Sequence, residues 1–313
     1  MRAVGVVEYG GPEALHVLEL PDPETGAGEV RVRVRAAAVN PTDTLARNGA
    51  RAEAQRAVSP PPYVPGMDAA GVVEEIGEGV STELQPGDHV MAIVVPAGSH
   101  GAYSERIVVP AESVARVPAG ASDVEACTLP MNGLTACLAL DTLGLHPGDT
   151  VAVTGAAGAF GGYVVQLAKA AGLRVVADAS ASDWQLVSDL GADIVVARGD
   201  DVATRIRQEI PDGVDGLVDG ALLDGLVTEA VRDGGRVVTV RGYRGTEERG
   251  VTFHPVFVRE YAREQRKLDS LRQLTEEGRI SLRVADTFRP EDAADAHRRL
   301  EAGGVRGRLV IEF

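Results

Sequence analysis

Residues 1–124 contain short segments in which hydrophobic and polar positions alternate. The longest, EVRVRVRAAAV, begins at Glu29, and Gly or Pro residues separate it from its neighbours. A period of two is typical of strands that bury one face. We therefore expect a β-rich domain here, with the stretch RNGARAEAQRAVSPPPYVPG forming an exposed loop because three consecutive prolines interrupt the pattern.

From residue 125 the pattern changes to predicted helices that alternate with short apolar strands. TVAVTGAAG is a strand that enters a turn, GYVVQLAKAAG a helix and LRVVADAS a second strand, and the same alternation continues to RVVTVRG. Such a series is typical of a parallel sheet covered on both faces. A long amphipathic helix, REYAREQRKLDSLRQLTEEG, then precedes a strand, a second helix and the final strand GRLVIEF.

Composition narrows the classes of partner. The chain has 313 residues, of which 44% are hydrophobic, and a formal net charge of −15. Binding to nucleic acid or to anionic lipid needs clustered positive charge, so we expect neither kind of partner. A run of apolar residues long enough to cross a membrane is absent from the sequence, and we expect a cytoplasmic protein. The two cysteines, Cys127 and Cys137, suit neither a disulfide framework nor a metal site.

The segment VAVTGAAGAFGGYVVQLAKAAGLRVVADAS carries the main chemical signal. Gly155, Gly158 and Gly161 lie between an apolar strand and a helix. Glycines there allow a tight turn and bring backbone N–H groups and the helix N-terminus against a pyrophosphate. Because strand, turn, helix and second strand follow in order, the sequence predicts a dinucleotide-binding Rossmann domain.

The end of the second strand decides between NADH and NADPH. NAD-binding folds place an acid there for the ribose 2′-hydroxyl, whereas NADP-binding folds leave room for a phosphate. Asp178 is an acid close to this point, but the aligned position is Ala179, and Ser180 follows with a hydroxyl suited to a phosphate. We expect NADPH, with NADH as the alternative.

Several blocks together resemble one known family. VRAAAVNPTDTLARNG, PYVPGMDAAGVVEEIGEGV, PGDHVMA, GAYSERIVVP, LPMNGLTA and the AAGAFG turn occur in the order found in quinone oxidoreductases, the zeta-crystallin-like branch of the medium-chain dehydrogenase/reductase superfamily. The resemblance implies an α/β protein in which a doubly wound Rossmann domain, residues 125–278, is inserted in a GroES-like catalytic domain, residues 1–124 plus 279–313. It also implies a homodimer, and TFHPVFV is the edge strand expected to join the two copies.

The resemblance implies hydride transfer from NADPH to a small-molecule substrate, either a quinone or an α,β-unsaturated carbonyl compound. Asn40 is the expected donor to the substrate oxygen, although a turn-forming role before Pro41 is the alternative, and Tyr63 is a candidate proton donor or substrate wall. Asp43 is expected to be structural. The expected cofactor-binding residues are Thr135, Gly155, Ala157, Gly158, Ala159, Phe160, Gly161, Ala179, Ser180, Arg198, Val240, Arg241 and Gly242.

Zinc is not expected. Zinc alcohol dehydrogenases of the superfamily bind catalytic zinc with two Cys residues and a His-Glu pair, because Zn²⁺ prefers thiolate and imidazole ligands. The matching positions here are Asn40, Met67 with Asp68, and Asn132. Of these side chains Asp68 alone is a zinc ligand, so we expect a reductase without a metal.

Three departures from the family concern the substrate and the cofactor. Leu45 replaces a common tyrosine, Asp183 replaces a basic residue beside the 2′-phosphate, and Arg198 at a neighbouring position offers a guanidinium for that phosphate. Two alternatives to a quinone reductase stay open. One is an enoyl-thioester or enone reductase of a biosynthetic pathway, for which the Arg-rich segments 47–65 and 242–263 are candidate contacts of an acidic substrate. The other is a cofactor-binding protein without turnover.

Overall fold

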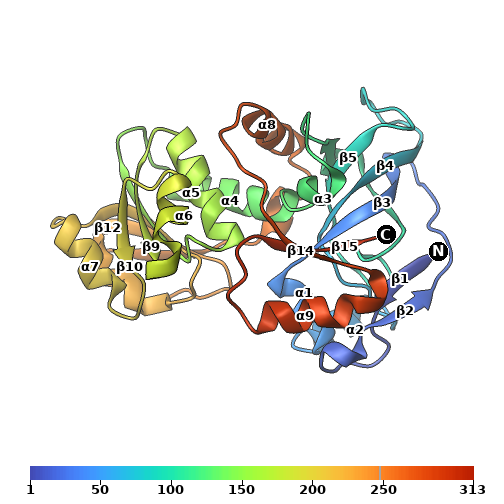
Figure 1. The fold of residues 1–313 in the computed structure, drawn as a ribbon, viewed down its shortest axis with the longest axis horizontal. Coiled ribbons are helices and arrows are strands. Elements are labelled where there is room, and N and C mark those ends of the chain that lie inside the picture. The colour runs from blue at the N-terminus through green and yellow to red at the C-terminus, as the bar shows by residue number, and fades with distance from the viewer. Residues whose placement is uncertain (247) are drawn as a thin grey trace. The chain divides into compact units, whose positions relative to one another are not determined.

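Two sheets of different kinds organise the chain, and each belongs to its own compact unit (Figure 1). The structure is a computed structural model that describes residues 1–246 and 248–313. The first unit comprises Met1–Met131 and Ala262–Phe313, and the second comprises Asn132–Tyr261. Helix α4, Pro130–Leu143, begins in the first unit and continues into the second. No helix of the described residues is long and apolar enough to cross a membrane.

The first unit is built on a mostly antiparallel sheet in the order β14-β15-β3-β4-β5-β7, with β6 also paired to β3. The alternation of hydrophobic and polar residues determines which face of this sheet is buried. In β3, Val30, Val32 and Val34 are buried, and arginines lie between them. A separate pair, β1 and β2, is also antiparallel. The strands are β1 Arg2–Gly5, β2 His16–Glu19, β3 Glu29–Val39, β4 Asp68–Ile76, β5 His89–Ile93, β6 Arg106–Pro110, β7 Val114–Arg116, β14 Val284–Phe288 and β15 Arg308–Glu312.

The C-terminal strands return to this unit, as the family resemblance implied. β15 pairs antiparallel with β3, so the last strand of the chain lies beside one of the first (Figure 1). The helices here are short: α1 Pro41–Arg47, α2 Ala52–Val58, α3 Asp123–Ala126, α8 Gln265–Glu276 and α9 Ala293–Glu301, with 3₁₀ turns η1 Pro12–Ala14, η2 Ala111–Ser113 and η6 Pro290–Asp292. The expectation that residues 47–66 form only a loop is wrong, because the segment AEAQRAV has enough helix-forming residues to build α2 before the prolines.

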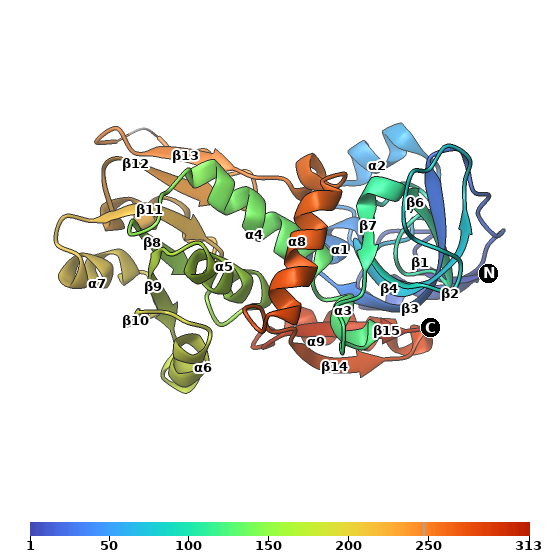
Figure 2. The same cartoon turned by 90° about the horizontal axis from the view of Figure 1, so that it is seen from above.

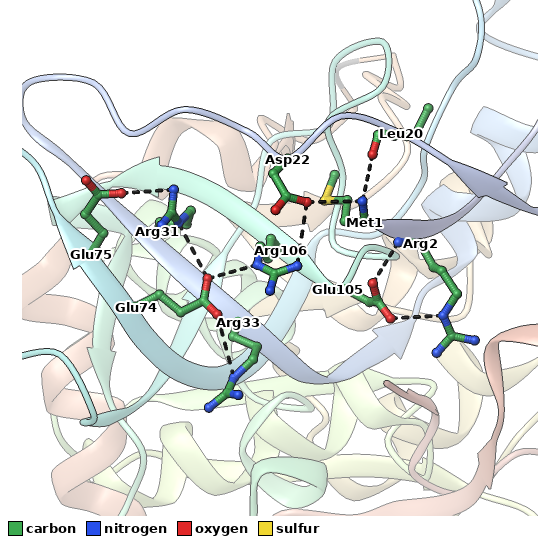
Figure 3. Close-up of polar contacts among 10 residues, drawn as sticks. All are labelled: Met1, Arg2, Leu20, Asp22, Arg31, Arg33, Glu74, Glu75, Glu105 and Arg106. Atoms are coloured by element: carbon green, nitrogen blue, oxygen red, sulfur yellow. Dashed lines mark hydrogen bonds and ion pairs between the residues drawn. The ribbon is translucent and has the colours of Figure 1, made fainter.

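The outer face of the first unit carries an ion-pair network that includes the N-terminus (Figure 3). Glu74 of β4 lies within 4 Å of three guanidinium groups, at 3.0 Å from Arg106, 3.5 Å from Arg31 and 3.8 Å from Arg33. Arg106 also lies 3.6 Å from Asp22, whose carboxylate is 3.1 Å from the N-terminal ammonium. These pairs join β3, β4 and β6 to the start of the chain. Because the charges form one network, they contribute to folding stability, whereas isolated exposed ion pairs contribute little.

The second unit contains a six-stranded parallel sheet in the order β10-β9-β8-β11-β12-β13. This is the strand order of the Rossmann fold, so the predicted fold class is confirmed. The strands are β8 Thr150–Thr154, β9 Arg174–Ala179, β10 Ile194–Ala197, β11 Val214–Asp219, β12 Val231–Thr239 and β13 Thr252–Pro255. The connecting elements are α5 Ala159–Ala170, η3 Ala181–Asp183, α6 Trp184–Asp189, α7 Val202–Glu209 and η4 Asp224–Ala230, and η5 Val258–Tyr261 follows β13.

Two local predictions in the second unit have different outcomes. β13 lies at the edge of the sheet, where TFHPVFV was expected, and the homodimer that this edge suggested stays a prediction. The alternation of helices and strands predicted up to RVVTVRG does not hold before that strand, where LLDGLVTEAVRDGG forms the 3₁₀ turn η4 rather than a helix, because β12 already begins at Val231. Gly225, Gly234 and Gly235 in that segment lower its helix propensity.

The expected domain boundaries after residues 124 and 278 differ from those of the structure, which lie after Met131 and Tyr261. Helix α8 belongs to the first unit, beside β7 (Figure 2). Its apolar residues Leu268 and Leu271 are buried, and Gln265 donates hydrogen bonds to the backbone of η2 and β7. An amphipathic pattern shows that a helix packs against a core, but not against which of two cores.

Candidate functional site

The predicted glycine turn follows β8 and leads into α5. Gly155 has φ of 68°, in the left-handed region that glycine adopts without strain. Gly158 is the N-cap of α5, and a Cβ added to Gly161 would lie 2.3 Å from the carbonyl oxygen of Gly155. The helix therefore begins directly against the turn, and its first N–H groups and those of the turn can bind an anion. Ala157, Ala159 and Phe160 complete this segment.

Asp178 of β9 braces the same turn. Its carboxylate accepts a hydrogen bond from the backbone N–H of Ala156 at 3.1 Å. Burial raises the pKa of Asp178, while the backbone N–H groups of Ala156 and Gly155 lower it. The carboxylate that made the choice of cofactor ambiguous is therefore directed at the turn. The sequence places an acid near the ribose position, but it does not show which way the side chain points.

Four residues expected at the 2′-phosphate corner lie at neighbouring strand ends. The backbone N–H of Arg198, after β10, donates to the carbonyl of Ala179 at the end of β9, at 2.9 Å. The Ser180 hydroxyl donates to the carboxylate of Asp183, which is buried, and also lies 2.9 Å from the hydroxyl of Ser182. The Arg198 side chain is exposed. A hydroxyl and a negative charge are thus present at this corner, and the Arg198 backbone lies beside them.

The carboxyl edge of the sheet holds a second buried acid that the sequence analysis missed. Asp219, the last residue of β11, accepts the Thr154 hydroxyl at 2.6 Å and the backbone N–H groups of Ala221 and Asp224 at 3.2 and 2.8 Å. These bonds fix the loops after β8 and β11. The sequence contains a signal for a turn at Asp219, because VDGLVDG places an Asp-Gly pair at the end of an apolar strand.

The residues expected beside the nicotinamide lie in α4 and after β12. Thr135 is in the first half of α4 and is buried, whereas Val240 and Arg241 follow directly on Thr239, the last residue of β12. Gly242 has φ of 89°, so a turn that favours glycine begins there. Their contacts with a cofactor stay predictions.

Asn40 and two buried aspartates form the centre of the first unit's site. The Asn40 side-chain amide donates to Asp68 at 2.6 Å, and the backbone N–H of Met131 donates to the other oxygen of Asp68 at 2.5 Å. Asp43 caps α1 by accepting the backbone N–H of Asn40 at 2.8 Å and also accepts the N–H of Gly66 at 3.2 Å, which agrees with its expected structural role. Burial raises the pKa of Asp43 to about 6 and that of Asp68 to about 7.

A hydrogen-bonded chain runs from Asp43 to the C-terminal helix. Tyr103 donates to Asp43 at 3.0 Å and lies 3.2 Å from Nε2 of His297 in α9, whose Nδ1 is 3.3 Å from Arg47. A guanidinium only donates, so Nδ1 accepts and Nε2 carries the proton. Arg47 also pairs with Glu301 at 2.6 Å and is 2% exposed. Arg47 is therefore not available to an acidic substrate, and that expectation for the segment 47–65 is corrected at this residue.

His297 makes stability depend on pH. Burial and, to a smaller extent, the charge of Arg47 together lower its pKa from 6.5 to about 3. Between these values the unfolded state binds a proton that the folded state does not, so stability is full above about pH 6.5 and falls below it. The unfolding free energy of the wild type relative to His297→Gln should therefore fall by up to about 1.4 kcal/mol for each unit by which the pH is lowered below about 6.5.

Denaturant unfolding of both proteins between about pH 7.5 and 5 measures this difference. Glutamine keeps one acceptor for Arg47 and one donor for Tyr103, so the chain of hydrogen bonds can persist. The carboxyl groups of Asp43 and Asp68 are present in both proteins, so their contributions to the pH dependence of stability cancel to first order in the difference. A difference that stays constant over this range would contradict the assignment of a buried, neutral imidazole.

Tyr63, the second candidate catalytic residue, is buried. Its ring stacks on Tyr9 with centroids 5.2 Å apart, and its hydroxyl donates to the backbone oxygen of Ser59 at 3.2 Å. The structure thus gives Tyr63 a packing role in the segment that follows α2. Its proposed contact with a substrate stays a prediction.

The positions that match zinc ligands of other superfamily members do not offer a ligand set. The Asn40 amide is engaged with Asp68, and the Met67 thioether accepts the Thr42 hydroxyl at 3.4 Å. Among the described residues, no three His, Cys, Asp or Glu side chains gather where they could hold a metal. Because amide and thioether groups are poor ligands of Zn²⁺, these donors do not fit a catalytic zinc.

Comparison with known proteins gives matches along the whole chain. Residues 26–119 match the alcohol dehydrogenase GroES-like domain family, and residues 190–311 match the zinc-binding dehydrogenase family. A 2-methylene-furan-3-one reductase of Solanum lycopersicum is 30% identical over 99% of this chain and 79% of its own length.

Solved structures of related proteins superpose on the whole of this chain. A quinone oxidoreductase from Coxiella burnetii superposes with a TM-score of 0.88 at 26% identity, covering 100% of this chain and 99% of its own. A mycobacterial protein in complex with NADPH superposes with a TM-score of 0.86 at 27% identity, with both chains covered over 100%.

Proposed function

We propose a function on the premise that the chain belongs to the quinone oxidoreductase branch of the medium-chain dehydrogenase/reductase superfamily. The protein is proposed to be an NADPH-dependent reductase that transfers hydride to a quinone or to an α,β-unsaturated carbonyl compound without a metal. The observation that carries the proposal is the glycine turn between β8 and α5, where Gly161 lies against the backbone of Gly155.

The residues of the second unit fit a dinucleotide. The N–H groups of the turn from Gly155 to Gly161 would bind the pyrophosphate, and Ser180 with Arg198 would bind the 2′-phosphate. Thr135 and residues 240–242 would hold the nicotinamide. When bound, the cofactor would supply the hydride. The NADPH complex of the mycobacterial neighbour supports the choice of cofactor.

In the first unit, Asn40 is proposed to donate a hydrogen bond to the substrate oxygen on which negative charge develops, in exchange for one of the bonds that its buried amide now donates to Asp68 and to the carbonyl of Ala38. Preorganised hydrogen-bond donors of this kind stabilise the transition state most when no metal polarises the carbonyl. The proton that completes the reduction is proposed to come from water, because His297 is buried and the carboxylates of Asp43 and Asp68 are held by hydrogen bonds. The poor zinc-ligand character of Asn40 and Met67 supports chemistry without a metal.

An assay of cofactor oxidation tests the proposal. Purified protein should oxidise NADPH in the presence of at least one small quinone or enone, and the rate should be unchanged in strong chelator. An enoyl-thioester in the same panel separates the biosynthetic reductase from the quinone reductase. NADPH that binds without oxidation by any acceptor would favour the cofactor-binding protein without turnover, and loss of activity in chelator would contradict a metal-free site.

A further inference from the structure

The strand order of the second unit reverses between β8 and β11. β9 and β10 follow β8 on one side of the sheet, whereas β12 and β13 follow β11 on the other. In sheets of this kind a ligand binds in the crevice outside the carboxyl ends of the two strands at which the order reverses. Thr154 and Asp219 are the last residues of these strands and are paired in register. The crevice expected to hold the dinucleotide therefore begins at this pair.

The two side chains are buried and belong to one group of hydrogen bonds. Thr154 is 0% exposed and Asp219 is 1% exposed. One oxygen of Asp219 accepts the Thr154 hydroxyl at 2.6 Å and the backbone N–H of Ala221 at 3.2 Å. The other oxygen accepts the backbone N–H of Asp224 at 2.8 Å. The carboxylate therefore joins both ends of the segment 220–224 to the end of β8.

This segment has an unfavourable backbone conformation. Among the described residues, those other than glycine with positive φ are Leu222, Asp224 and Arg249, and the first two lie in the segment with φ of 60° and 55°. A side chain disfavours the left-handed region by about 10-fold per residue. The bond from the N–H of Asp224 to Asp219 offsets part of this cost, so without the carboxylate the segment would leave the conformation.

The segment also packs against the glycine turn that is proposed to bind the pyrophosphate. A Cβ added to Gly155 would lie 2.9 Å from the carbonyl carbon of Gly220, and one added to Gly220 would lie 3.2 Å from the ring of Phe160. The backbone N–H of Gly220 donates to the carbonyl of Thr154 at 3.2 Å. The segment 220–224 therefore lies beside the turn, on the β11 side of the crevice.

We propose that Asp219 is a positioning residue for the dinucleotide, which keeps the segment 220–224 in the left-handed conformation that shapes the β11 side of the crevice. The buried carboxylate acts through its bonds to Thr154 and to the segment, and it does not touch the cofactor. This inference rests on the proposed function, because the crevice receives its dinucleotide there.

A double variant removes these bonds without leaving one partner behind. Thr154→Val with Asp219→Leu replaces both side chains by apolar groups of similar shape. Replacing both partners of a buried hydrogen bond in this way costs much less stability than removing one of them. The double variant should therefore fold, with the segment 220–224 free to leave the left-handed region.

The double variant should bind NADPH about 10- to 100-fold more weakly than the wild type, because only molecules with the segment in place are competent to bind. NADH should weaken by the same factor, since the 2′-phosphate corner lies at the ends of β9 and β10. Adding Asp224→Gly should regain about 10-fold for both cofactors, because glycine adopts a φ of 55° without strain. A general loosening of the fold would not be reversed by a glycine.

Fluorescence titration with NADPH and NADH measures the affinities, and thermal unfolding measures the stability of each variant. Thr142→Val is the control, because it also removes a Thr hydroxyl from the second unit. That hydroxyl donates to the carbonyl of Leu138 within α4, at 2.7 Å. The affinity of Thr142→Val for NADPH should equal that of the wild type.

Unchanged NADPH affinity in the folded double variant would overturn the proposal. Failure of Asp224→Gly to regain affinity would overturn it as well, because the loss would then not come from the conformation of the segment. If the double variant does not fold, Asp219→Asn with and without Asp224→Gly carries the same test, since one carbonyl oxygen cannot replace two carboxylate oxygens. A wild type that binds neither NADPH nor NADH would refute the proposed function and the inference together, whereas a wild type and a double variant that bind equally well refute the inference alone.

Discussion

Replacing Gly161 by alanine should abolish detectable NADPH binding at concentrations that saturate the wild type. The added Cβ would lie 2.3 Å from the Gly155 oxygen, 2.7 Å from the Gly155 carbonyl carbon and 2.8 Å from the Cα of Ala156. All three are backbone atoms, so the turn must shift away from α5. We expect affinity to fall by more than about 100-fold, because N–H groups displaced from the pyrophosphate lose charged hydrogen bonds of about 1.5 to 3 kcal/mol each.

The same substitution should cost about 1 to 3 kcal/mol of folding stability, as overpacking usually does. Fluorescence titration with NADPH and thermal unfolding measure the two effects separately. Gly158→Ala is the matched control, since its Cβ would lie 3.1 Å from the same oxygen and its backbone is in the ordinary extended region. We expect less than about a 10-fold loss there. Normal affinity in a folded Gly161→Ala protein would show that this turn does not bind the cofactor.

Replacing Arg198 by alanine should weaken NADPH and leave NADH almost unchanged. The backbone of Arg198 is hydrogen-bonded to Ala179, beside Ser180 and Asp183, so we expect its guanidinium to reach a 2′-phosphate there and to offset the negative charge of Asp183. A hydrogen bond to a charged group contributes about 1.5 to 3 kcal/mol, or roughly 10- to 150-fold in affinity. Because Arg198 is exposed, solvent screening favours the lower end of that range.

The ratio of kcat/KM values for NADPH and NADH, measured in both proteins, reports this effect. Arg174→Ala is the control, because Arg174 is exposed at the opposite end of β9 and its loss changes the net charge equally. The wild type should prefer NADPH, and the ratio should be unchanged in Arg174→Ala. Equal losses for both cofactors in Arg198→Ala, or a wild type that prefers NADH, would show that Arg198 does not set the choice of cofactor.

Patterns within about 25 residues determined the parts of the protein that the sequence predicts well. The alternation in β3, the order of strands and helices from β8 to β10, and the glycines of the turn are local signals, because strand period, helix period and left-handed φ depend on nearby residues. Short segments were harder to predict from the sequence. The seven residues of α2 lie between a glycine turn and the prolines, so their helical propensity competed with strong turn signals.

The tertiary structure alone decided which distant residues meet. The sequence contained the amphipathic pattern of α8, but the burial of Leu268 and Leu271 beside β7 assigned the helix to the first unit. Asp43, Tyr103 and His297 come from three separate segments, so no local period connects them. A buried polar group must find its partner wherever folding brings one, and that partner is set by the packing of whole elements rather than by neighbours in the chain.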